Sequence, residues 1–204
     1  RDVTRQAVGL SPHGGGGPGA GPVAVSRKLV PFLPRPTVER REDGTFFLDH
    51  ARPDSIGRLR TFLGNFGMFV RAFAYISSYG NRIGEVARGA VLNANYVRAG
   101  LAGVYHLKYD APTMHEVVFS DKKQVEHGVS NMDIAKRLMD YGFHPPTVSF
   151  PLIVHGALMI EPTESESKEE LDRFCDAVIA IRDEIREIEE GRADRSMNVL
   201  KMAP

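Results

Sequence analysis

The chain lacks a net charge, because its 26 basic residues are balanced by 26 acidic ones. Without a basic excess it cannot neutralise a phosphate backbone, so nucleic acid is not expected as a partner. No apolar run approaches the roughly 18 residues of a membrane span, so no membrane contact is expected. The only cysteine is Cys175, which excludes an internal disulfide and favours a cytoplasmic location.

Several catalytic signatures are also missing. The seven histidines are scattered and show no zincin spacing, so no metal site is expected. No Gly-x-Ser-x-Gly elbow occurs, and Cys175 falls inside an apolar helical stripe, which argues against a thiol nucleophile. A phosphate-binding P-loop is rejected because Pro18 follows Gly17, where a Lys-Ser/Thr pair would be needed.

A run of glycine and proline occupies residues 11–22. Neither a helix nor a strand tolerates such a run, so it is a flexible linker or a rigid loop, and composition leaves both open. The backbone N–H groups of Gly14, Gly15, Gly16 and Gly17 could cradle an anion, and His13 stands at their edge. The start at Arg1, close before this run, suggests a piece of a larger protein.

The first half of the remaining chain predicts one hairpin and three helices. A short amphipathic helix is expected over 23–33, and Asp43-Gly44 predicts a hairpin within 37–50. Apolar residues recur at helical spacing over 64–99, interrupted at Gly80-Asn81. Asn93 and Asn95 fall in the middle of the last helix, where they are poor helix formers. We interpret them as part of a solvated face.

The second half predicts a mixture of strands and helices. Strands are expected over 115–120, 148–154 and 157–161, and helices after the capping residues Ser130 and Ser167. Gly191 is expected to end the last helix before a polar tail. This order indicates an α/β fold with a small sheet covered by helices on one face. In a strand, His115 and Glu116 would point to opposite faces and could not share a metal ion.

Several segments together resemble one family. The most specific are Pro12-His13-Gly14-Gly15-Gly16-Gly17-Pro18-Gly19 and the run 133–147, accompanied by 64–67, 92–96, 115–116 and 159–164. They resemble the C-terminal half of glycine decarboxylase, the P-protein of the glycine cleavage system, as subunit 2 of its two-subunit form. The resemblance covers about Ser11 to Ile188.

The resemblance implies the C-terminal portion of a fold type I pyridoxal-phosphate enzyme. Residues 1–60 would be a remnant of the large cofactor domain, 61–100 connecting helices, and 101–204 a small C-terminal α/β domain. The helices between 66 and 97 would then expose apolar surface, since their cover lies in the large domain. The implied reaction is decarboxylation of glycine with transfer of the aminomethyl group to the lipoyl arm of H-protein. A partner P-protein subunit and a higher oligomer are also implied.

One departure from the family bears on activity. The family places a His-Lys pair shortly before the glycine run, and its lysine holds pyridoxal phosphate as a Schiff base. Counted back without gaps, that lysine falls on Ala7, so the chain alone is expected to be inactive. The resemblance implies active-site roles for His13 and Gly14 to Gly17, with Asn65, His115 and His144 as weaker pocket candidates. A non-catalytic scaffold of the same fold and a simple anion-binding module are the alternatives.

Overall fold

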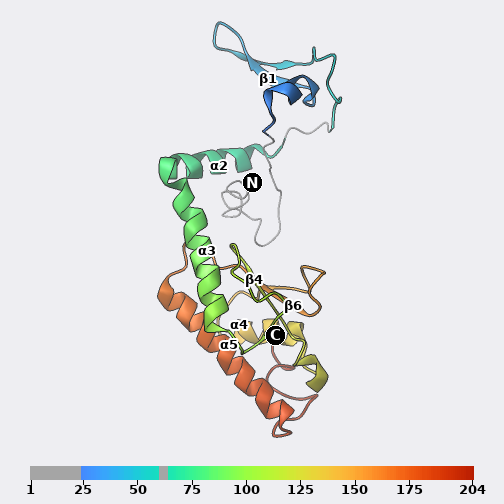
Figure 1. Cartoon of the computed structure of the whole chain (residues 1–204), viewed down its shortest axis with the longest axis vertical. Helices are drawn as coiled ribbons and strands as arrows, with labels where there is room; N and C mark the ends of the chain where they lie inside the picture. Colours follow the sequence, from blue (N-terminus) through green and yellow to red (C-terminus); the bar gives the residue numbers. More distant parts are fainter. Residues whose placement is uncertain (1–23, 60–63) are drawn as a thin grey trace. The chain divides into compact units, whose positions relative to one another are not determined.

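The computed structural model describes residues 24–59 and 64–204. The chain divides into two compact units, residues 1–81 and 82–204, and each is described by itself (Figure 1). None of the helices in the described ranges is both long and apolar enough to cross a membrane. His13 and Gly14 to Gly17 lie outside the described residues, as does Ala7.

The first unit contains the predicted hairpin. Its strands are β1 (Thr37–Arg40) and β2 (Phe46–Asp49), which pair antiparallel with Thr37 opposite Asp49. The connection turns at Gly44, whose φ of 85° suits glycine, and the Asp43 carboxylate accepts the Thr45 N–H at 2.9 Å. The Asp-Gly signal is therefore confirmed. The helix expected over 23–33 is a shorter 3-10 helix, η2 (Arg27–Phe32), with Pro31 inside it and no buried residue.

Arg52 holds this hairpin region together. Its guanidinium donates to the Thr37 hydroxyl at 2.9 Å, to the Val30 carbonyl at 3.0 Å and to the Glu39 carboxylate at 2.8 Å. These bonds join η2, β1 and the segment that follows β2. Polar contacts therefore organise residues 24–59, in which no side chain is fully buried.

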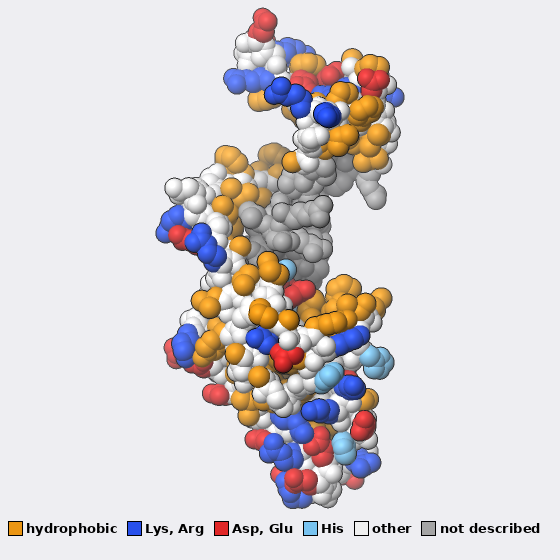
Figure 2. Space-filling view, viewed as in Figure 1, with side chains coloured by type: hydrophobic (Ala, Val, Ile, Leu, Met, Phe, Trp, Pro, Cys, Tyr) orange, Lys and Arg blue, Asp and Glu red, His pale blue; other side chains and the backbone are white. Residues whose placement is uncertain are grey.

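Helix α2 (Phe66–Tyr79) completes the first unit. It ends at Gly80, which has a φ of 54°, as the Gly80-Asn81 interruption predicts. Its apolar stripe is exposed, with Phe66 at 80% and Phe73 at 73% of full exposure. Hydrophobic side chains accordingly appear on the surface of the first unit in Figure 2. The expectation of exposed apolar surface over 66–97 is confirmed for this helix. It is wrong for the stripe of the following helix, where Val86, Ala90, Ala94 and Val97 are buried.

The second unit has an antiparallel sheet of four strands in the order β3-β4-β6-β5. Val118 of β4 and Thr147 of β5 both pair with Met159 of β6. Figure 2 shows basic and acidic side chains interspersed over this unit. Its elements are α3 (Ile83–Gly100), β3 (His106–Leu107), β4 (Val117–Ser120), η4 (Val125–His127), α4 (Asn131–Asp140), β5 (Thr147–Val148), β6 (Ala157–Ile160) and α5 (Lys168–Glu189), and the 3-10 turn η3 (Gly80–Arg82) precedes α3.

Helices cover one face of this sheet. Because side chains alternate along a strand, Val117 and Phe119 of β4 and Leu158 of β6 face the same way. All three lie in one core with buried residues of α3, α4 and α5, and in Figure 1 these helices lie beside the sheet strands. The predicted α/β arrangement, a small sheet with helices on one face, is confirmed.

The predicted caps are present with one difference. Ser130 and Asp133 form a reciprocal capping box at the start of α4. At the start of α5 the Ser167 hydroxyl accepts the Glu170 N–H at 3.2 Å, but the Glu170 carboxylate binds Arg173 instead of closing the box. Beyond this start α5 buries the predicted stripe, which includes Leu171, Cys175, Val178, Ile181, Ile185 and Ile188.

Two expectations for the residues after α4 are wrong. The strand expected over 148–154 is reduced to β5, because Ser149 takes a φ of 59° and turns the chain out of the sheet. The tail after Gly191 is not merely polar: Leu200 is completely buried in the core. Lys201 also donates to the Asp133 carboxylate at 2.6 Å, so the tail is fixed to the start of α4.

Candidate functional site

The weaker pocket candidates lie in different surroundings. Asn65 is the N-cap residue of α2 in the first unit, and its side chain makes no capping hydrogen bond. His144 is exposed in the loop after α4, where Nδ1 lies 2.9 Å from the Pro145 carbonyl. The contacts of His144 and those of His115 have no residue in common.

His115 lies between two carboxylates. Its Nε2 is 3.9 Å from Oε2 of Glu116 and 3.9 Å from Oε1 of Glu161. The expectation that His115 and Glu116 point to opposite faces is wrong, because β4 begins only at Val117 and strand alternation does not extend to them.

The three groups are also accessible. The exposed fractions of the His115, Glu116 and Glu161 side chains are 25%, 37% and 49%. Glu116 and Glu161 stand just past the last paired residues, Val117 and Ile160, so the sheet register brings two like charges together. No group of three His, Cys, Asp or Glu side chains suited to a metal ion occurs within 24–59 and 64–204. His115, Glu116 and Glu161 thus form a partly exposed polar cluster at the end of β4 and β6.

Asn95 fixes the segment that carries His115. Its Nδ2 donates to the Thr113 carbonyl at 2.7 Å, while its Oδ1 accepts the Thr113 N–H at 3.0 Å. Nδ2 also donates to Val91 one turn earlier in α3, at 2.8 Å. The Thr113 hydroxyl in turn donates to the Glu116 carbonyl. These bonds hold residues 113–116 against α3.

Asn93 fixes the second segment of the cluster. Its Nδ2 donates to the carbonyls of Thr163, at 2.8 Å, and Glu166, at 3.2 Å. One turn earlier, Gly89 lets the same segment approach, since a Cβ there would lie 3.1 Å from the Glu164 Cβ. The interpretation of Asn93 and Asn95 as a solvated face is therefore wrong. Their position in mid-helix, where asparagine is disfavoured, was the signal available in the sequence.

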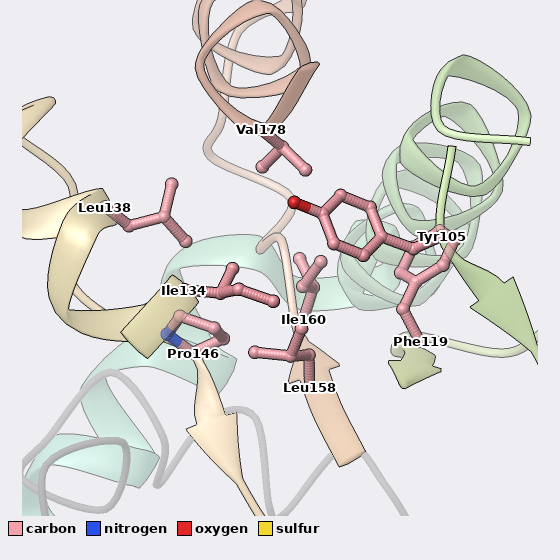
Figure 3. A pocket seen from close by; sticks show the side chains of 8 residues that line it. All are labelled: Tyr105, Phe119, Ile134, Leu138, Pro146, Leu158, Ile160 and Val178. Carbon is pink, nitrogen blue, oxygen red and sulfur yellow. The ribbon is translucent and has the colours of Figure 1, made fainter. Parts of the chain in front are cut away.

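An apolar cavity lies between the sheet, α4 and α5 (Figure 3). Its lining contains one hydroxyl, that of Tyr105, which points toward Val178. That hydroxyl has no hydrogen-bond partner, and its burial raises the pKa of Tyr105. The other lining residues are Phe119, Ile134, Leu138, Pro146, Leu158, Ile160 and Val178. A lining of this kind suits packing rather than chemistry.

The two hollows described in this chain contain no lysine that could form a Schiff base. No lysine lines the cavity of Figure 3 or the shallow hollow beside Ala87 and Leu92 on α3. Lys108 donates to the Ile153 carbonyl, Lys168 to Asp172 and Lys201 to Asp133. With Ala7 at the position that the resemblance assigns to the cofactor lysine, neither the cavity nor the hollow fits covalently held pyridoxal phosphate.

Comparison with known proteins supplies a family. Residues 86–204 match the family model described as glycine dehydrogenase, C-terminal domain. The chain is 54% identical over 177 residues to the probable glycine dehydrogenase (decarboxylating) subunit 2 of Exiguobacterium sibiricum, covering 86% of this chain and 36% of the relative. It is 52% identical over 196 residues to the protein of the same name from Chlorobium chlorochromatii, covering 95% and 39%.

A solved structure agrees in fold. It is the inhibitor-bound crystal structure of glycine decarboxylase (P-protein) of the glycine cleavage system. The match has a TM-score of 0.58 and 18% identity, and it covers 78% of this chain and 38% of that chain. At this identity the likeness concerns the fold alone. The chain thus spans little more than a third of the length of the proteins it matches.

Proposed function

Because the chain belongs to the glycine dehydrogenase C-terminal domain family, we propose that it is the C-terminal part of subunit 2 of a glycine cleavage P-protein. The complete enzyme is a glycine dehydrogenase (aminomethyl-transferring). It decarboxylates glycine and transfers the aminomethyl group to the lipoyl arm of H-protein. The observation that carries this proposal is the 54% identity over 177 residues to a protein of that name.

Pyridoxal phosphate is proposed as the cofactor of the complete enzyme only. The residues present in this chain do not fit its covalent attachment, since Ala7 stands where the family lysine is expected. The chain alone is therefore proposed to be inactive. A non-catalytic scaffold with the same fold is the second candidate function, and Ala7 is the observation that favours it.

Roles in the site are proposed residue by residue. His13 is assigned to catalysis, and Gly14, Gly15, Gly16 and Gly17 to an active-site loop that cradles the cofactor. Among the described residues His115 is the strongest pocket candidate, because two carboxylates flank it. Asn65 and His144 stay weaker predictions, since neither side chain joins that cluster.

The proposed setting follows from the same family membership. The partners are lipoylated H-protein and a second P-protein subunit within a higher oligomer, in the cytoplasm. The division into residues 1–60, 61–100 and 101–204 stays a prediction. The two compact units part between residues 81 and 82, and α3 packs on α5, so α3 would connect the domains while contributing to the smaller one.

A chimera tests the proposed function. Residues 11–188 of this chain replace the matching segment of the Exiguobacterium sibiricum subunit, which supplies its own upstream sequence. With the other subunit and lipoylated H-protein, we expect labelled carbon dioxide to be released from glycine at a rate within about tenfold of the unmodified relative. A folded chimera that binds pyridoxal phosphate but releases no carbon dioxide would favour the scaffold.

Absorbance gives a second test on the chain itself. Titration of the 204-residue chain with pyridoxal phosphate is expected to give no visible internal-aldimine band, because the required lysine is missing. The unmodified relative serves as the positive control. A band with this chain would contradict the expected inactivity and would require another lysine to form the imine.

A further inference from the structure

Two amide side chains of α3 hold both segments that meet at His115. Asn95 binds the N–H and the carbonyl of Thr113, at 3.0 and 2.7 Å. Asn93 binds the carbonyls of Thr163 and Glu166, at 2.8 and 3.2 Å. Each asparagine binds backbone groups of a segment that is distant in sequence. Backbone groups removed from water need hydrogen-bond partners, and in these two segments the asparagine side chains supply them.

The sheet accounts for only part of the cluster. The last pairing of β4 with β6 is Val117 with Ile160, so the register itself brings Glu116 and Glu161 together. Two neighbouring carboxylates repel one another, and strand pairing does not extend to His115. Something other than the sheet must therefore place the imidazole 3.9 Å from both carboxylates.

The contacts of Asn95 lead directly to His115. The amide of Asn95 fixes the Thr113 backbone, and the Thr113 hydroxyl donates to the Glu116 carbonyl. This bond bridges Thr113 and Glu116, the residues on either side of the bend that contains His115. On the opposite side Gly89 and Asn93 fix the segment that continues from Glu161.

We propose that Asn95 and Asn93 are positioning residues, which set His115 between Glu116 and Glu161 by holding their two segments on α3. The placement itself does not depend on what the protein does. The further statement that it serves glycine decarboxylation rests on the proposed function. Neither asparagine needs to touch the substrate, so each acts through His115 and its carboxylates.

The placement is tested by NMR on the isotope-labelled 204-residue chain. Cross-relaxation between the His115 ring protons and the Glu161 side chain is expected in the native chain and is expected to disappear in Asn95→Ala. Asn95→Asp is nearly isosteric but loses the donor to the Thr113 carbonyl, so the same loss is expected. Asn93→Ala is expected to weaken the signal at least twofold.

Asn131→Ala is the matched control. Asn131 also donates from Nδ2 to a carbonyl, that of Ala157 at 3.0 Å, and to the Ser149 hydroxyl, but it contacts neither segment of the cluster. It should retain the His115–Glu161 signal although it destabilises the unit.

The Val118–Met159 contact between β4 and β6 reports whether the sheet is intact in each variant. If Asn95→Ala loses the Val118–Met159 contact as well, its sheet is disrupted, and the nearly isosteric Asn95→Asp is used to test the placement of His115. An undiminished His115–Glu161 signal in a variant of Asn95 with an intact sheet would overturn the proposal.

Activity is measured separately in the chimera described above. Misplacing a pocket group by about 1 Å can cost up to a hundredfold in rate, so we expect Asn95→Asp to lower carbon dioxide release at least about tenfold. Asn131→Ala should lower it less than threefold. An unsubstituted chimera without activity would count against the proposed function, while the NMR result would still decide the placement. Equal losses in the two variants would refute the positioning role.

Discussion

Helices α2 and α3 follow one another along the chain, and both carry an apolar stripe at helical spacing. Helix α3 buries its stripe, with Ala94 and Val97 completely inaccessible. Helix α2 leaves Phe66 and Phe73 at 80% and 73% exposure, and Met68 is its one buried residue. The periodicity thus predicts a helix in both places, but it does not tell which helix has a partner within the described residues.

The two units also differ in how much apolar surface they bury. Residues 82–204 contain a continuous apolar core that joins the sheet, three helices and the C-terminal tail. In residues 24–59 the Arg52 guanidinium and the hairpin ladder supply the order instead. The energy of burying apolar side chains is therefore concentrated in the second unit.

The largest expected effect comes from emptying the core of the second unit. Ile181 lies on α5 and is completely buried. Ile181→Ala is expected to lower the free energy of unfolding by about 2–5 kcal/mol, through lost transfer energy and the cavity left behind. Urea unfolding followed by circular dichroism measures it. Ile179→Ala on the same helix is the control, because that side chain is 36% exposed. Equal losses at both positions would show that α5 is not packed as described.

The next effect concerns the tail that closes the second unit. Burial alone would raise the pKa of Asp133, but hydrogen bonds from Lys201 and Ser130 outweigh it and hold that pKa below its ordinary value. Lys201→Met should therefore cost about 1.5–3 kcal/mol at pH 7, the range for a hydrogen bond to a charged group. Stability profiles of both proteins between pH 7 and pH 2 provide the measurement.

The sign of the pH dependence follows from the lowered pKa. A carboxyl with a lowered folded-state pKa contributes stability above its unfolded value, near 3.8, and loses it as the pH falls through the folded value. The difference between the native chain and Lys201→Met should accordingly shrink below pH 4. Lys136→Met, in the middle of α4, is the control. A difference that stayed constant down to pH 2 would mean that the ion pair does not stabilise the tail.

Local signals were sufficient for much of this fold. Asp43-Gly44 predicted the hairpin, Ser130 and Ser167 predicted the starts of α4 and α5, and the apolar stripe around Cys175 predicted which face of α5 is buried. The tail was missed because Lys201 and Asp133 are 68 residues apart and no local pattern links them. Asn93 was misread for the same reason, since its partner Thr163 is 70 residues away. Of the candidate site, the sequence named His115. The register of β4 and β6 brings only Glu116 and Glu161 together, and the segment of His115 is held by the bonds of Asn95 to Thr113, which no local pattern predicts.

A smaller effect of opposite sign is expected inside the core. Tyr105 is 4% exposed and its hydroxyl has no hydrogen-bond partner. Tyr105→Phe removes a buried, unsatisfied group and should raise the free energy of unfolding by about 1 kcal/mol. Urea unfolding again provides the measurement. Tyr141→Phe is the control, because the Tyr141 hydroxyl donates to Glu184 at 3.0 Å and its loss should destabilise. A destabilised Tyr105→Phe would indicate that a water molecule satisfies the hydroxyl.

The smallest change in stability is expected on the exposed apolar stripe of α2. Phe73 has few contacts to lose, so Phe73→Gln should change the free energy of unfolding by less than about 0.5 kcal/mol. The same substitution should reduce the fluorescence of a bound hydrophobic dye, because it interrupts an exposed apolar stripe. Val97→Gln on α3 is the counterpart: it buries a polar amide in the core and should destabilise strongly. If Phe73→Gln destabilised the chain as much as Val97→Gln, the stripe of α2 would be covered in solution, and the contrast between the two helices would disappear.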